Sequence, residues 1–93
     1  MIVGTVLVKM YAPWVHSLKE KRMVVRSITS KIRNQFNVSV IEAQEQDIHQ
    51  TIVLGIAFAA GNTALADSTI DNVIDFIESN SEAEITDIQR EIR

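Results

Sequence analysis

Basic side chains gather in the segment that begins at His16. Successive residues of an α-helix turn by about 100°, so four bases of a helix over residues 18–35 share an arc of about 60°. These four are Lys19, Arg22, Arg26 and Arg33. A row of arginines suits phosphate, because each guanidinium presents a planar fork of donors to an oxyanion. The predicted anion-binding residues are His16, Ser17, Lys19, Lys21, Arg22, Arg26 and Arg33.

Acidic side chains gather later in the chain. Residues 38–93 hold eleven of the twelve acids and two of the nine bases. Four acids of a second predicted helix share an arc of about 80°. They are Asp67, Asp71, Asp75 and Glu78. Solvation of exposed helix faces is the simpler explanation of both stripes, and part of the basic stripe can face the acidic one. The net charge of −3 restricts any nucleic-acid binding to the basic element.

Residue patterns typical of an active site are weak. Asp47 and His49 offer two ligands to a metal ion, but a third ligand at a fixed spacing is missing. Ser17 adjoins His16, yet a role as helix cap explains it better than a role as nucleophile. The three glycines stand apart, so they form no phosphate-binding loop. We therefore expect a protein that is not an enzyme, with no metal and no cofactor.

Six elements position these residues. Apolar runs at residues 2–11, 38–43, 51–60 and 83–92 predict strands. Ser17 with Glu20 forms a capping box that predicts a helix over residues 18–35. Asn62 or Thr63 begins a second helix, whose buried stripe has the spacing i, i+3, i+4, i+7. Its members are Ile70, Val73, Ile74 and Ile77.

The strand-helix-strand-strand-helix-strand order predicts an α+β fold. With right-handed crossovers it gives a ferredoxin-like βαββαβ sandwich, in which a four-stranded antiparallel sheet of order 4-1-3-2 carries both helices on one face. The whole of residues 1–93 is expected to form this single domain. Apolar even-numbered residues of 2–11 and 51–60 should face the helices.

Odd-numbered strand residues should then form the open face of the sheet. This face is more apolar than solvation needs, which favours a homodimer or a protein partner. The predicted contact residues are Val3, Leu7, Tyr11, Val53 and Ala57, to which Ile41 and Ile85 are added. The alternative is that small sheets are apolar on both faces through strand propensity alone. RNA-recognition motifs share this topology, but they stack bases on aromatic residues of the central strands. Tyr11 is the one aromatic residue that the open face offers.

Composition sets the general class of the protein. It has 93 residues, of which 46% are hydrophobic and 23% charged, within the range of globular domains. Cysteine is absent, which fits a reducing compartment. Residues 1–8 are apolar but too short to span a membrane, and they lack the pattern of a signal peptide. We expect a cytoplasmic protein with no membrane partner.

Residues 16–22, with the sequence His-Ser-Leu-Lys-Glu-Lys-Arg, resemble the helix start of the bacterial YlxP-like proteins, a family of unknown function. The likeness extends over residues 1–5, 24–25, 33–34, 36–40, 42 and 46–47, and so over essentially the whole chain. It implies a ferredoxin-like fold. Genes of the family often lie among those for transcription elongation factors, translation initiation factors and a ribosome-maturation factor, which implies a role linked to RNA or the ribosome. It implies no established activity.

Two positions depart from the family pattern. Leu7 stands where the family often has an acid, which makes the open face more apolar. His49 stands where the family often has an aromatic residue, which disfavours base stacking by the segment around residue 47. The sequence therefore predicts a binding protein for structured RNA or a ribosomal component through its first helix. The alternative is a homodimer or protein-interaction module that works through the open face and has no role with nucleic acid.

Overall fold

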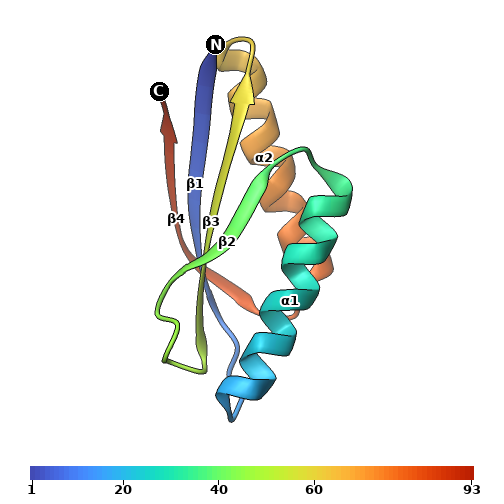
Figure 1. Cartoon of the computed structure of the whole chain (residues 1–93), viewed down its shortest axis with the longest axis vertical. Helices are drawn as coiled ribbons and strands as arrows, with labels where there is room; N and C mark the ends of the chain where they lie inside the picture. Colours follow the sequence, from blue (N-terminus) through green and yellow to red (C-terminus); the bar gives the residue numbers. More distant parts are fainter.

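The computed structural model describes residues 1–93 and contains the six expected elements (Figure 1). They are β1 (Ile2–Tyr11), α1 (Leu18–Gln35), β2 (Ser39–Gln44), β3 (Thr51–Ala60), α2 (Thr63–Asn80) and β4 (Glu84–Ile92). All neighbouring strands pair antiparallel, in the order β2-β3-β1-β4. This is the predicted order 4-1-3-2 counted from the opposite edge. The ferredoxin-like α+β fold is therefore confirmed.

Side-chain caps begin both helices. The Ser17 hydroxyl accepts a hydrogen bond from the Glu20 backbone N–H at 3.1 Å, and the Glu20 carboxylate accepts one from the His16 N–H at 3.5 Å. The predicted capping box is therefore present, although its second bond is long. The Asn62 side chain caps α2 by accepting a bond from the Leu65 N–H at 2.9 Å. Because each cap satisfies an amide at a helix end, the starts of both helices are fixed by local sequence.

The hydrophobic core lies between the sheet and the two helices, which cover one face of it (Figure 1). The even-numbered residues of β1 and β3 point into this core, as predicted. Its buried members from β1 and β3 are Val6, Val8, Met10, Ile52, Leu54, Ile56 and Phe58, and β2 adds Val40. The helices contribute Ile28 and Ile32 from α1, and Ala66, Ile70, Val73 and Ile77 from α2. Neither helix combines the length and apolar character that crossing a membrane requires.

A β-bulge changes which side of β4 faces the core. The β1–β4 register shifts between Lys9 and Met10, so that Met10 lies opposite Ile85 and Thr86 is the extra residue. Ile85 consequently turns toward the helices and packs against the core. The prediction that Ile85 belongs to the open face was wrong. Strict alternation from Asp87 would have placed Ile85 on the open face. The extra residue Thr86 moves Ile85 to the face that the helices cover.

Candidate nucleic-acid interface

Three of the predicted basic residues form a continuous exposed surface on α1, here called the basic face: Lys19, Arg22 and Arg26. They line a hollow of about 390 Å³ together with Met23. All three are exposed, and none lies within ion-pair distance of a carboxylate. Their charges therefore remain available to a ligand from solvent.

Lys21 was predicted to contact phosphate, and the structure places it elsewhere. Its side chain is 1% exposed, and its ammonium lies 2.8 Å from a Glu42 carboxylate oxygen on β2. The ammonium also donates to the backbone carbonyls of Glu45 at 2.5 Å and Ile48 at 2.7 Å. The contact with Glu42 is an ion pair without hydrogen-bond geometry, so this buried carboxylate oxygen is compensated by charge alone. Lys21 is thus a structural residue that fastens α1 to the β2–β3 connection, and it cannot reach a ligand on the basic face.

Arg33 lies beyond the basic face, toward the end of α1. It follows Arg26 by seven residues, which corresponds to about 10 Å along the helix axis. One of its guanidinium N–H groups donates to the Val40 carbonyl on β2 at 2.8 Å. Arg33 is exposed, but one of its donors is used by the Val40 carbonyl. Because it also lies farther along the helix, the structure does not bring it together with the other three basic residues.

His16 and Ser17 lie at the entrance of α1. The Ser17 oxygen is used by the helix cap, which matches its expected role in holding the helix start. His16 is exposed beside it. The Glu20 carboxylate occupies the same first turn and accepts from the His16 N–H, so the helix entrance already has an internal anion. The unpaired positive charge of α1 therefore lies on the basic face and not at the helix entrance.

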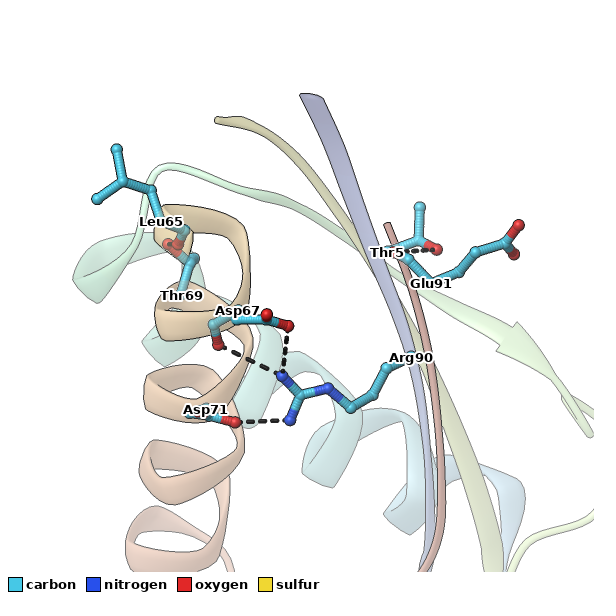
Figure 2. A network of polar contacts seen from close by, with 7 residues as sticks. All are labelled: Thr5, Leu65, Asp67, Thr69, Asp71, Arg90 and Glu91. Carbon is cyan, nitrogen blue, oxygen red and sulfur yellow. Dashed lines mark hydrogen bonds and ion pairs between the residues drawn. The ribbon is translucent and has the colours of Figure 1, made fainter. Parts of the chain in front are cut away.

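Two acids of the α2 stripe, Asp67 and Asp71, pair with the sheet, and none of the four pairs with α1. Arg90 of β4 reaches across to α2, where its guanidinium lies 2.6 Å from Asp71 and 3.2 Å from Asp67 (Figure 2). The hydrogen bond to Asp71 is the main reason why the pKa of Arg90 is raised above its usual value. No ion pair joins α1 to α2. The alternative in which the two helical stripes neutralise each other is thus absent from this structure.

The open face of the sheet contains a separate apolar hollow of about 450 Å³. Leu7 and Ala57 line it as predicted, Ile41 is 62% exposed at its β2 side, and Glu91 and Arg93 lie at its β4 side. Tyr11 is exposed at the far end of β1, whereas Val3 lies near the opposite end and is half-buried.

Val53 was predicted as a contact residue of this face, but it is 3% exposed. It lies in a smaller polar hollow together with Leu7, Lys9, Gln44, Asp87 and Gln89. Long polar side chains of this kind cover apolar neighbours with their stems. The open face therefore has an apolar half around Ile41 and a more polar half around Val53, where Val53 itself is too buried to contact a partner.

Trp14 and Met23 were missed by the sequence interpretation. Trp14 is 39% exposed in the β1–α1 connection, and Met23 is 63% exposed on α1. A sequence signal existed for Met23, because at 100° per residue it falls about 40° from Lys19 and so borders the basic stripe. Asp47 and His49 are both exposed in the β2–β3 connection. No group of three carboxylate, imidazole or thiol side chains could hold a metal ion.

Fold and surface define a small ferredoxin-like domain with an unpaired basic helix face. Residues 3–90 match the family described as "Protein of unknown function (DUF503)", and the chain belongs to this family. It is also similar to the protein of Bacillus subtilis (strain 168) named "Uncharacterized protein YlxP". The two are 39% identical over 70 residues, which cover 75% of this chain and 76% of that protein. The resemblance to the YlxP-like proteins is therefore confirmed.

Proposed function

We propose that this protein is a non-catalytic RNA-binding protein of the cytoplasm, and that its ligand is a structured RNA or a ribosomal component. The observation that supports the proposal most directly is the basic face. Lys19, Arg22 and Arg26 share one hollow on α1, and no carboxylate of the chain pairs with them. Arg22 and Arg26 can each grip a phosphate bidentately, and Lys19 adds a point charge.

The segregation of charge should direct nucleic acid to one side of the molecule. The protein carries a net charge of −3, so nucleic acid is repelled from the acid-rich elements and attracted only to α1. Asp67 and Asp71 pair with Arg90 of β4, and neither pairs with a base of α1. Binding through a few phosphate contacts should consequently occur through α1 at low salt and weaken at high salt.

The test is co-sedimentation with ribosomal particles at roughly 50 and 200 mM salt, a range over which phosphate contacts weaken strongly. Wild-type protein should sediment with the particles at the lower salt and be released at the higher. The Arg22→Glu/Arg26→Glu variant should stay in the supernatant at both. The matched control is Lys9→Glu/Lys31→Glu, which makes the same charge change at two exposed bases off the basic face. Equal sedimentation of the two double variants contradicts the proposal.

The open sheet face supports a second candidate function, a homodimer without a role in RNA binding. The supporting observation is the 450 Å³ apolar hollow, with Ile41 62% exposed beside it. A second copy would cover this side chain and remove apolar surface from water. Analytical ultracentrifugation tests this candidate. The wild type should form dimers that resist salt, and Ile41→Glu should be monomeric. A monomeric wild type at high concentration excludes the candidate.

A further inference from the structure

A second hollow lies directly beside the basic face. It measures about 280 Å³ and is lined on one side by Trp14 and by Met23, Val24, Ser27 and Ile28 of α1, and on the other by Asn80, Ser81 and Glu82 at the end of α2. Met23 belongs to the linings of both this hollow and the basic one. The two hollows therefore meet at Met23, and a single extended ligand can occupy both.

Trp14 is held in place by the turn that contains it. The Val15 N–H donates to the Ala12 carbonyl at 3.1 Å, and the Gln50 side-chain amide donates to the Pro13 carbonyl at 3.1 Å. Ala12 and Val15 on either side are completely buried. The indole is 39% exposed, so part of it contacts solvent while the backbone that bears it is fixed. A ligand that stacks on this ring has little ordering entropy to overcome.

One exposed tryptophan lies beside three basic side chains that have no ion pair. This combination matches the chemistry of a nucleotide strand. Proteins that bind single strands combine cationic groups along the backbone with aromatic side chains on which bases stack. In a duplex the base faces are covered by their neighbours, so an aromatic platform discriminates in favour of unpaired bases. The opposite wall is polar, and a carboxylate such as that of Glu82 can accept a hydrogen bond from an exocyclic amino group of a base.

We propose that the site binds a single-stranded segment of RNA, with an unpaired base against Trp14 and Met23 and the flanking phosphates on the basic face. This inference rests on the proposed function and makes its ligand more specific. The basic face supplies charge-dependent affinity for any phosphate backbone. The Trp14 hollow supplies preference for an unpaired base over a duplex.

The chain contains one tryptophan, so its intrinsic fluorescence reports on Trp14 alone. Full-length protein is titrated with a short single-stranded RNA of mixed sequence and with the blunt duplex of the same sequence. Each RNA carries a dye, so that anisotropy measures binding while tryptophan emission measures stacking. The single strand should bind more tightly and quench Trp14, whereas the duplex should leave the emission unchanged.

Substitutions separate stacking from simple apolar packing. Trp14→Leu should weaken single-strand binding by about 5- to 150-fold, the range that corresponds to losing one stacked base, and leave duplex binding unchanged. Trp14→Phe keeps an aromatic ring and should retain most of the affinity. This variant still tests stacking if Trp14→Leu does not fold. Tyr11→Leu is the matched control, because Tyr11 is similarly exposed but lies on the open sheet face. It should bind like the wild type.

The outcomes distinguish this inference from the proposed function beneath it. If neither RNA changes the anisotropy, the proposed function fails, and the hollow is left for a protein partner. If RNA binds but Trp14 is not quenched and Trp14→Leu binds as well as the wild type, the phosphate contacts stand and the inference is overturned. Equal affinity for single strand and duplex overturns it as well.

Discussion

The Lys21 ammonium lies 2.8 Å from the Glu42 carboxylate, and the lysine side chain is 1% exposed. This pair links the first turns of α1 to β2 across the helix–sheet interface. The same ammonium donates to the Glu45 and Ile48 carbonyls, which anchors the β2–β3 connection to the helix. A buried charge is tolerated only when it is paired and hydrogen-bonded, and here the ammonium has an ion pair with Glu42 and hydrogen bonds to two carbonyls. The basic segment that predicts an anion site therefore contains bases of two kinds. Lys21 stabilises the fold, and the bases of the basic face remain exposed.

Removal of this ammonium should destabilise the fold. Lys21→Met leaves the Glu42 charge without its partner and the Ile48 carbonyl without its donor, while the Glu45 carbonyl keeps the bond from the Ile48 N–H. We expect a loss of about 3 kcal/mol in the free energy of unfolding, the low end for a broken buried pair, because Glu42 remains 18% exposed. Urea unfolding followed by circular dichroism measures it.

Two further variants identify the cause. Lys19→Met alters an exposed lysine two residues away and should change the free energy of unfolding by less than about 0.5 kcal/mol. Lys21→Met/Glu42→Gln removes both charges and should recover part of the loss. A double variant less stable than Lys21→Met contradicts the argument that an uncompensated carboxylate causes the loss.

Local patterns explain how much of the fold was predictable. The capping residues Ser17 and Asn62 and the apolar periodicity are properties of short segments, so the elements, their order and their faces could be predicted. The bulge at Thr86 could not, because it depends on how two distant strands align. For the same reason Ile85 was placed on the wrong face. Val53 lies on the predicted face, and its burial depends on side chains from neighbouring strands.

The candidate site was predictable only in part. The arc that holds Lys19, Arg22 and Arg26 follows from helix geometry and the structure brings these residues together. The burial of Lys21 depends on carbonyls of the β2–β3 connection, where Glu45 adopts a φ of 59°, and nothing in a helical pattern reveals them. Trp14 lies outside every periodic segment, so its position beside α1 emerges only from the packed structure.

Gly4 should be intolerant of a side chain. It lies directly opposite Phe58 in the β1–β3 register, and a Cβ atom added to it would overlap the phenyl ring. Gly4→Ala must displace that buried ring, with an expected loss of about 1–3 kcal/mol in the free energy of unfolding. Gly61→Ala is the control, because its nearest neighbour would lie 3.9 Å away at Leu65. Gly4→Ala should lower the free energy of unfolding less in a Phe58→Leu background than in the wild type. An equal loss in both backgrounds contradicts the steric explanation.

Arg90 should contribute modestly to stability and in a way that depends on salt. It bridges β4 to Asp67 and Asp71 of α2 (Figure 2). All three side chains are more than a third exposed. Arg90→Gln should therefore lower the free energy of unfolding by no more than about 1 kcal/mol at low salt. The difference from wild type should shrink in 1 M salt, where the Debye length is about 3 Å. Lys31→Gln, at a base without an ion pair, should show no such dependence.

Glu91 should remain ionised to lower pH than an isolated glutamate. Arg93 donates to both of its carboxylate oxygens, at 2.8 and 3.0 Å, and these hydrogen bonds lower the pKa of Glu91. A carboxyl whose pKa is lower in the folded state contributes stability above its unfolded pKa and loses that contribution as pH falls through the folded pKa. The pair is exposed, so the effect belongs to titration and not to a large change in stability. NMR titration of the Glu91 side-chain carbon should give a lowered pKa in the wild type and a normal one in Arg93→Gln. Identical titration curves in the two proteins rule out the Arg93 hydrogen bonds as the cause.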